Sequence, residues 1–472
     1  MSRKFQYRAI PNTWLENNGR RLDCGPYMSG AVEAKELLRK HITEPLKDLT
    51  AGHNGGIFNG PRFPRVYVKD PAKGVPFLGS TDILDADLSF VSLLSKKQVE
   101  ENPALLIDEG WTLITCSGTI GRMAYARSDM RNMAGSQHFM RVLPNIDRIK
   151  SGYLYAYLSS RFGVPIIASG TYGAIIQHIE PHHIADLPVP RLAAVEDQAH
   201  ELIQKAALLR VEAASEIREG TRRFLAAACI EDVPPHEWLQ KSGQLGFTAS
   251  ISKTVLRAVN YIPLNLKLAE IVRTSSPAWK TLADVTEPGT LRSGLRFKRI
   301  DCEPEYGVEL IGQREISALV PNGRWIAKNQ LPNDKLIFVP DGTIMVNAQG
   351  GLNESDSYAR CQFISGKKLR YAYSQHFLRV IANENVIPRG ALFAYLRSNI
   401  AFRLLRSCAI GSMQQDFHSG LIREVPVPII SDAEVKAVDS LVTSAYKKYD
   451  EAIDYEDQAR LLVERAIEEG GH

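Results

Sequence analysis

The sequence predicts an α+β fold in which two similar globular units of mixed α/β structure are each followed by a long helix. Three observations support this prediction. Short strings from the first part of the 472-residue chain recur in the same order in its second part. Each copy begins with short β-type segments and ends at a Pro-Val-Pro string. Each Pro-Val-Pro string precedes about 35 residues rich in Ala, Glu, Leu, Arg and Lys, a composition typical of a long helix.

The repeat is visible in six pairs of strings, of which AGSQHFMRV (134–142) and AYSQHFLRV (372–380) are the clearest. The second member of each pair lies 232 to 238 positions after the first, and the order never changes. Preserved order with so little drift indicates a duplication rather than chance similarity. The other pairs are PLKDLT (45–50) with TLADVT (281–286), VPFLGSTDI (75–83) with VELIGQREI (308–316), EGWTLITCSG (109–118) with DGTIMVNAQG (341–350), GYLYAYLSS (152–160) with GALFAYLRS (390–398), and YGAIIQHIEPHHIADLPVP (172–190) with IGSMQQDFHSGLIREVPVP (410–428).

Within each unit the sequence predicts strands first and a helix afterwards. One continuous helix is expected at 151–163 and another at 388–405, where apolar residues recur at spacings of three and four. The prolines of 188–190 and 426–428 are expected to end regular structure, because proline lacks a backbone N–H. Short apolar or alternating segments bounded by Gly or Pro predict the strands. In the first unit these segments are RVYVKD (65–70), PFLGS (76–80) and WTLITCS (111–117).

The two long helices are expected at 193–231 and 432–469, each with apolar residues along one face. Because they occupy equivalent places in the repeat, antiparallel pairing about a pseudo-two-fold axis is the favoured arrangement. The alternative is that each helix folds back on its own unit. The predicted boundaries are a first unit at 1–190 (with 1–44 as an N-terminal extension), a first helix at 191–232, a second unit at 233–428 and a second helix at 429–472.

Composition is that of a globular protein, with 44% hydrophobic and 23% charged residues. Six cysteines form no CxxC pair, and no apolar run has the length of a signal peptide or membrane span, so a cytoplasmic protein with reduced thiols is expected. The net charge is +4, but residues 432–469 carry 11 acids against five bases. The rest of the chain is therefore basic, notably LRSGLRFKR (291–299), which indicates a partner-binding surface or a solvated face.

The strings TLITCSGTIG, SQHFMRV, GYLYAYLSS and IIQHIEPHHIADLPVP, each followed by a second copy, resemble the specificity subunits of type I restriction–modification systems. The resemblance covers nearly the whole chain except the first roughly 40 residues. It implies two target recognition domains, each ending in a segment like DLPVP (186–190) or EVPVP (424–428), and two conserved spacer helices. The segment 350–373 is longer than its first-half counterpart, so the second domain departs locally from the first.

The resemblance further implies a non-catalytic subunit without cofactor. It would bind a bipartite, asymmetric site in double-stranded DNA and recruit DNA adenine methyltransferase subunits, two in number, with a translocase or endonuclease subunit where the complex contains one. Two alternatives of other classes stay open. One is a stand-alone DNA-modifying enzyme with degenerate motifs, and the other is an interaction scaffold that does not bind DNA.

Motifs for catalysis are weak. DVPPH (232–236) has the wrong spacing for a methyltransferase motif, and GHNGG (52–56) and AQGG (348–351) lack the pattern of a phosphate-binding loop. The histidine of each Ser-Gln-His string could act as a base, but no acid follows it to orient the ring. Since the Phe and Val of each string resemble strand residues facing a core, a scaffold role is favoured for His138 and His376.

Three nearby histidines raise the question of a metal site. His178, His182 and His183 are ligands by residue type, yet the second copy keeps none of them in register. No metal site is therefore predicted. The candidate DNA contacts are instead polar residues in variable loops, where Arg, Ser, Thr and Gln suit base edges and Lys and Arg suit phosphates. They are Arg62, Arg65, Ser117, Thr119 and Arg122 in the first half and Arg292, Arg296, Lys298, Arg299 and Gln349 in the second.

Overall fold

The chain forms two compact units with α+β structure, which confirms the predicted fold class. The first unit comprises residues 1–84, 91–211 and 451–472, and the second comprises residues 85–90 and 212–450. Each long helix therefore contributes one segment to each unit. The computed structural model describes residues 7–17, 20–117, 120–170, 178–241, 246–251 and 255–470.

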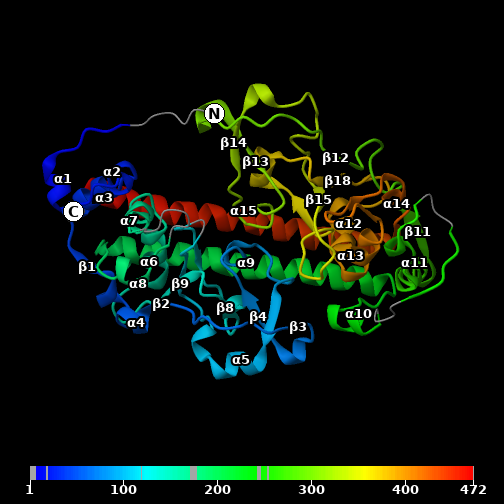
Figure 1. Ribbon diagram of the computed structural model, residues 1–472, viewed down its shortest axis with the longest axis horizontal. Coiled ribbons are helices and arrows are strands. Elements are labelled where there is room, and N and C mark those ends of the chain that lie inside the picture. The colour runs from blue at the N-terminus through cyan, green and yellow to red at the C-terminus, as the bar shows by residue number, and fades with distance from the viewer. Residues whose placement is uncertain are drawn as a thin grey trace. The chain divides into compact units, whose positions relative to one another are not determined.

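Most elements of the first unit are labelled in Figure 1. Its helices are α1 (Asn12–Asn17), α2 (Gly25–Met28), α3 (Ala31–Leu38), α4 (His53–Gly56), α5 (Lys96–Glu101), α6 (Ser151–Leu158), α7 (Gly163–Ser169), α8 (Pro181–Ile184) and the N-terminal part of α9 (Ala194–Ala227). Its strands are β1 (Thr43–Pro45), β2 (Ile57–Asn59), β3 (Tyr67–Val68), β4 (Gly74–Leu78), β5 (Ser92–Ser95), β6 (Thr112–Thr115), β7 (Met123–Tyr125), β8 (Ala134–Gly135), β9 (Phe139–Val142) and β10 (Pro188–Pro190).

Three sheets organise these strands. One is antiparallel in the order β2-β9-β6-β7, one has the order β3-β5-β4-β8 with a parallel β4–β8 pair, and β1 pairs with β10. Helix α6 is buried almost all round, and it packs into the main core with β6, β9 and the long helices. The central strand β6 is buried along its whole length, and α6 packs against it.

The second unit contains the remaining elements. Its helices are the C-terminal part of α9, α10 (Pro235–Lys241), α11 (Pro263–Ser275), α12 (Arg389–Leu396), α13 (Asn399–Arg406), α14 (Ser419–Arg423) and the N-terminal part of α15 (Asp432–Glu469). Its strands are β11 (Ala278–Thr281), β12 (Arg292–Ser293), β13 (Gly307–Ile311), β14 (Arg324–Ala327), β15 (Thr343–Asn347), β16 (Cys361–Ile364), β17 (Ala372–Tyr373), β18 (Phe377–Val380), β19 (Ala409–Ile410), β20 (Asp416–Phe417) and β21 (Pro426–Ile429).

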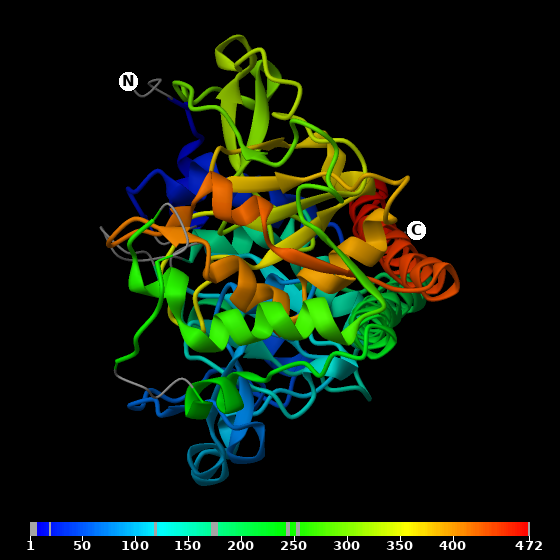
Figure 2. The ribbon, with the colours of Figure 1, turned by 90° about the vertical axis from the view of Figure 1, so that its right-hand side faces the viewer.

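The strand pairing of the second unit repeats that of the first. The order β12-β18-β15-β16 matches β2-β9-β6-β7, the order β14-β13-β17 matches β5-β4-β8, and β11 pairs with β21 as β1 pairs with β10. The β13–β17 pair is parallel, as is β4–β8. Figure 2 shows β13 and β14 as neighbouring yellow-green arrows. The duplication seen in the sequence is therefore a duplication of sheet topology.

The Pro-Val-Pro strings are strands, so the prediction that they end regular structure is wrong. Residues 188–190 form β10, and residues 426–428 lie within β21. Each belongs to a two-stranded sheet, in which both strands are edge strands. Proline is tolerated in an edge strand, because the side of the strand that lacks an N–H can face away from the pairing partner. Tyrosine hydroxyls also use the proline carbonyls, since Tyr157 donates to Pro188 O at 2.5 Å and Tyr395 donates to Pro426 O at 2.7 Å.

The segment 388–405 forms two helices rather than the single helix that was predicted. Helix α12 ends at Leu396, and α13 begins at Asn399. Ser398 adopts an extended backbone conformation between them, and its hydroxyl accepts a hydrogen bond from Ala401 N. An N-cap serine satisfies one of the free N–H groups of a new helix, which stabilises a break that apolar spacing alone does not reveal.

Segments of α9 and α15 lie side by side in both units (Figure 1). In the second unit Arg223 pairs with Glu434 at 2.6 Å, and Lys448 Nζ lies 2.7 Å from Glu212 and 2.8 Å from Glu216. Residues later in α9 thus contact residues earlier in α15, so the two segments are antiparallel.

The helix segments of the first unit are joined by a buried ion pair. Arg210 Nη2 lies 2.7 Å from Glu456 Oε1, and these side chains are 9% and 6% exposed. Ile203 of α9 and Val463 of α15 share the main core of the unit. Both long helices thus bury an apolar stripe in each unit, as helices of this length require. No helix in the described ranges is long and apolar enough to cross a membrane.

Candidate nucleic-acid interface: two equivalent arginine–glutamine–histidine clusters

Two short motifs meet in each unit, and only one of them is the Ser-Gln-His string. The other is Gly-x-Arg-Phe-x-Arg, which occurs at 60–65 as GPRFPR and at 294–299 as GLRFKR. It follows β2 in the first unit and β12 in the second. Strands β2 and β12 pair with β9 and β18, the strands that contain the end of each Ser-Gln-His-Phe-x-Arg string. The sheet therefore brings the two motifs together twice.

The arginine that ends the Ser-Gln-His string of the first unit is fully buried. Arg141 donates from Nη2 to Gly135 O at 2.8 Å and to Leu105 O at 3.2 Å. Burial lowers the pKa of this guanidinium to about 10. A Cβ atom added at Gly60 would lie 2.9 Å from Arg141 Nη1. Glycine is therefore required at the start of the GPRFPR motif, because the backbone passes directly over the guanidinium.

The second unit uses the same construction. Arg379 is fully buried and donates to the carbonyl oxygens of Leu336 at 2.8 Å and Tyr373 at 3.0 Å. Burial lowers its pKa to about 10 as well. A Cβ atom at Gly294 would lie 2.7 Å from Arg379 Nη2. In both units, then, a buried arginine orders the Ser-Gln-His backbone and packs against the glycine of the other motif.

A chain of polar side chains runs along the surface above the buried arginine of the first unit. Arg65 Nη2 donates to Gln137 Oε1 at 2.5 Å, which fixes the orientation of the amide. Gln137 Nε2 then lies 3.2 Å from His138 Nε2. An amide nitrogen only donates, so Nε2 accepts and the imidazole proton lies on Nδ1. His138 Nδ1 lies 3.0 Å from Ser117 Oγ, so this N–H donates a hydrogen bond to the serine hydroxyl oxygen.

The second unit contains the same chain up to the histidine. Arg299 donates to Gln375 Oε1, and Gln375 Nε2 lies 3.1 Å from His376 Nε2. His376 Nδ1 is buried and has no hydrogen-bond partner among the described residues. Arg65 and Arg299 also occupy equivalent positions. Arg65 lies two residues before Tyr67, which pairs with β5, and Arg299 lies two residues before Asp301, which bridges to β14. We call Arg62, Arg65, Gln137 and His138 the first cluster, and Arg296, Arg299, Gln375 and His376 the second cluster.

Both clusters are electropositive surfaces. Burial, followed by the charges of Arg65 and Arg62, lowers the pKa of His138 below its usual value. Burial, followed by the charges of Arg299 and Arg296, lowers the pKa of His376 in the same way. The imidazoles are therefore neutral near pH 7, and the arginines supply the positive charge.

The first arginine of each Gly-x-Arg-Phe-x-Arg motif is exposed. Arg62 and Arg296 form no ion pair or hydrogen bond in the parts of the chain that the structure describes. The intervening phenylalanines, Phe63 and Phe297, pack against small apolar cores. Alternation between packed and exposed residues thus points one cation of each motif to solvent, where it is available to an anion.

Two positions beside the clusters differ between the units. In the first unit Ser117 forms an isolated antiparallel bridge with His178. In the second unit Gly350 bridges Gln415, which places Gln349 opposite Asp416 at the equivalent point. Gln349 Nε2 lies 3.4 Å from Asp416 Oδ2. The charge of Asp416 acts on His376, so this pair is adjacent to the second cluster.

The other predicted contact residues are placed differently. Thr119 lies outside the described residues, and Arg122 lies in the β6–β7 hairpin, where its backbone pairs with Thr115. Arg292 forms an ion pair with the nearly buried Asp334 at 2.7 Å, and this partner raises the Arg292 pKa. Arg292 therefore has a structural role, in an ion pair next to Arg379. Lys298 is exposed between Phe297 and Arg299.

Inspection of the sequence found the arginines of both motifs but missed their equivalence. The signal was present, because Gly-x-Arg-Phe-x-Arg recurs 234 positions apart. It also missed Gln137 and Gln375 as partners of those arginines. A scaffold role was favoured for the whole Ser-Gln-His string. In the structure its Phe, Arg and Val are core residues, whereas its Gln and His belong to the clusters.

The three histidines near residue 180 do not converge on a metal. His183 Nδ1 accepts a hydrogen bond from Glu180 N at 3.0 Å as part of a capping box for α8. The His182 ring lies 3.9 Å from the His183 ring, centroid to centroid. Among the described residues, no group of three or more His, Cys, Asp or Glu side chains could hold a metal ion.

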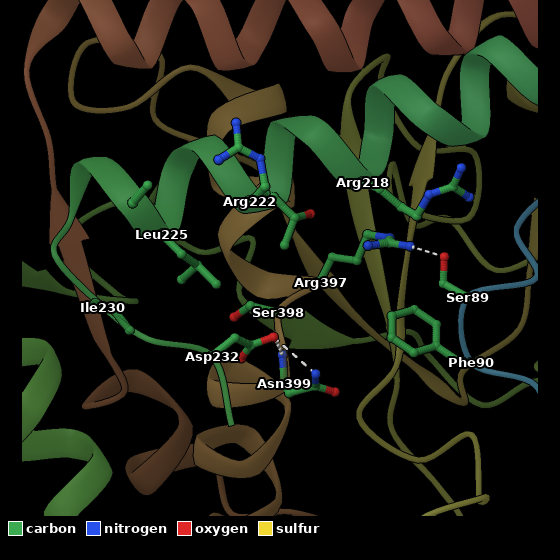
Figure 3. Close-up of a pocket in the computed structure, with 12 residues that line it drawn as sticks. Ser89, Phe90, Arg218, Arg222, Leu225, Ile230, Asp232, Arg397, Ser398 and Asn399 are labelled. Carbon is green, nitrogen blue, oxygen red and sulfur yellow. Dashed lines mark hydrogen bonds between the residues drawn. The ribbon is translucent and has the colours of Figure 1, made fainter. Parts of the chain in front are cut away.

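A pocket of about 470 Å³ lies elsewhere in the second unit, beside α9 (Figure 3). Arg397 pairs with Asp87 at 2.5 Å and donates to Ser89 Oγ at 2.9 Å. Asp232 accepts a hydrogen bond from Asn399 Nδ2 at 2.9 Å and helps to cap α13. The buried charges of this pocket are thus paired within the fold. Residues from three segments of the unit line the pocket, namely 89–90, 218–232 and 397–399.

Comparisons with known proteins place the chain beside one group of solved structures. No protein-family model and no curated protein matches it. It is similar to a type I restriction–modification S subunit from M. genitalium at 12% identity and TM-score 0.33, covering 91% of this chain and 95% of that chain. It is also similar to an HsdS subunit from Thermoanaerobacter tengcongensis at 11% identity and TM-score 0.25, with coverage of 90% and 96%.

A third structure comes from work on complex assembly and conformational transition of the type I R-M system. It matches at 11% identity and TM-score 0.25, with coverage of 90% of this chain and 97% of that chain.

Proposed function

We propose that this chain is the sequence-specific DNA-recognition subunit of a type I restriction–modification complex or a related phage-defence complex. The observation that carries the proposal is the presence of two equivalent arginine-bearing clusters, one in each unit. A protein that presents the same cationic surface twice suits a target with two half-sites. Arginine contacts phosphates and guanine edges, and glutamine pairs with adenine edges.

The bipartite and asymmetric character of the site follows from the differences between the units. The proposed target recognition domains are 1–190 and 233–428, and the proposed spacer helices are 191–232 and 429–472. Each domain would bind one half of the target, and because Ser117 and His178 are replaced by Gln349 and Asp416, the two halves would differ in sequence. Catalysis, S-adenosylmethionine and any translocation would belong to methyltransferase and translocase or endonuclease partners.

Selection from a randomised duplex DNA library tests this proposal. The full-length chain, alone and with the proteins that co-purify with it from its host, is expected to enrich two short sequence blocks separated by a spacer of fixed length. Failure to enrich any sequence in either preparation would contradict the proposal. Methyl transfer to DNA by the purified chain without partners would instead favour the stand-alone enzyme.

The proposed role of the long helices has its own test. Helix α9 has 34 residues, and a helix rises about 1.5 Å per residue, so it spans about 51 Å, roughly one and a half turns of B-DNA at about 34–36 Å per turn. Removal of one helical turn from α9 is expected to change the preferred spacer in the selection. An unchanged spacer would show that the helices do not set it.

A further inference from the structure

The two clusters are alike, whereas the residues beside them differ, and this contrast separates two kinds of DNA contact. Their four side chains are the same in both units and make the same hydrogen bonds from arginine through glutamine to histidine. A surface that is the same in two domains with different targets suits a feature that every half-site contains. The phosphate backbone is such a feature, because it carries the same charge whatever the sequence.

The positions that differ have the chemistry of base recognition. Asp416 is half-buried, its Oδ1 accepts from Phe417 N at 2.7 Å, and its Oδ2 lies toward Gln349. A carboxylate only accepts hydrogen bonds and is repelled by phosphates. On a DNA-binding surface it is stabilised by an amino group, and in the major groove only adenine N6 and cytosine N4 supply one.

Gln349 strengthens this assignment. Its backbone N and O are held by the Gln313 side chain at 3.2 Å and 2.7 Å, so the Gln349 position is fixed. Its amide makes only long hydrogen bonds, donating to Asp416 Oδ2 at 3.4 Å and accepting from Gln414 Nε2 at 3.4 Å, which a base edge can replace. A glutamine amide pairs best with adenine N6 and N7. The equivalent Ser117 of the first unit carries a hydroxyl, which both donates and accepts and therefore imposes no such requirement.

We propose that the first and second clusters bind DNA phosphates in the same way, and that Gln349 and Asp416 select adenine or cytosine at one position of the half-site bound by the second unit. The inference rests on the proposed function and deepens it. It assigns affinity to the residues that the units share and specificity to the residues by which they differ.

Asp416→Asn tests the specificity half of the proposal, using the full-length chain and its co-purifying proteins. Selection from the randomised duplex library should lose the preference for adenine or cytosine at one position by roughly 5-fold or more, in line with the value of a base contact. The other half-site should be unchanged. Affinity for random duplex should not fall, because the variant removes a negative charge. Unchanged base preferences would overturn the assignment.

Arg62→Gln and Arg296→Gln test the affinity half, because these exposed arginines have no partner among the described residues. Each should weaken binding to all duplexes alike and reduce the slope of log K against log salt by about 0.9, the value for one phosphate contact. Their selected motifs should match that of the unaltered chain. A changed base preference in either variant would overturn the phosphate assignment.

Two controls separate the possible failures. Gln349→Ala leaves the backbone bonds to Gln313 in place, so it should fold and relax the same base position even if Asp416→Asn melts at a lower temperature. If the unaltered chain enriches no sequence at all, the proposed function and this inference both fail. If it enriches a bipartite motif that neither Asp416→Asn nor Gln349→Ala alters, this inference alone fails.

Discussion

The first and second clusters begin alike and end differently. In both, an arginine donates to a glutamine and the glutamine faces a histidine, over a buried arginine that holds the backbone. In the first unit the chain continues from His138 to Ser117, whereas His376 Nδ1 has no partner within the described ranges. The shared part is fixed by strands and buried groups, and the differing part lies just beyond β6 and β15 and on the segments that bridge to them. The comparison shows a duplicated scaffold that presents different side chains at one equivalent point.

The largest expected effect is on the buried arginines that the two units share. Arg379→Met should lower the free energy of unfolding by about 4 kcal/mol or more, because the carbonyls of Leu336, Phe377 and Tyr373 lose a charged donor. Arg141→Met should act similarly, since it leaves the carbonyls of Gly135 and Leu105 without theirs. Urea unfolding monitored by circular dichroism measures both.

If the scaffold is equivalent in the two units, the losses in Arg141→Met and Arg379→Met should agree within about 1 kcal/mol, given the spread of such effects. A large loss in one unit and none in the other would break the comparison between the clusters.

The next effect concerns the long helices, where the two units differ in burial. Glu456→Gln should cost about 3 kcal/mol, because it leaves the buried Arg210 charge without its partner. Glu434→Gln removes a pair whose side chains are 41% and 35% exposed, and it should cost much less, because solvent screens the two charges. Urea midpoints of the two variants provide the comparison. Equal losses would show that burial does not distinguish the two helix contacts.

A smaller effect is expected at the glycines that meet the buried arginines. Gly60→Ala and Gly294→Ala should each cost about 1–3 kcal/mol, because the added methyl group lies within 3 Å of a guanidinium. Gly55→Ala is the matched control, since nothing lies within 4 Å of its added Cβ. Thermal melting compares the three variants. Neutral substitution at Gly60 or Gly294 would contradict the close packing of the two motifs.

The smallest effect is a pH dependence at the clusters. The folded protein lowers the pKa of His138 and His376, so it favours their neutral forms. Protons then bind the unfolded chain first, and stability should fall as the pH drops below the ordinary histidine pKa of about 6.5, with no contribution at higher pH. His376→Gln should reduce this acid sensitivity more than His138→Gln, because His376 is the more buried. Urea unfolding at pH 5.5 and pH 7.5 measures the difference, and identical slopes in all three proteins would contradict it.

Much of the fold was predictable because it depends on periodic patterns. The repeat, the α+β class and the positions of the long helices follow from ordered strings and from apolar spacing, which are local properties of the chain. The break between α12 and α13 and the strands made by the Pro-Val-Pro strings were not predicted. The break depends on the capping hydroxyl of Ser398, and the strands depend on pairing with β1 and β11, which are distant in sequence. The spacing of apolar residues contains neither kind of information.

The sequence by itself determined the duplication, the helix pair and the arginines of each Gly-x-Arg-Phe-x-Arg motif. Only the tertiary structure decided that Arg65 meets Gln137, that Arg299 meets Gln375, and that Arg292 serves an ion pair with Asp334 instead of the second cluster. The physical reason is that these contacts are made across sheets, between residues 42 to 76 positions apart. Such pairings depend on strand register, and register is set by the packing of the whole unit.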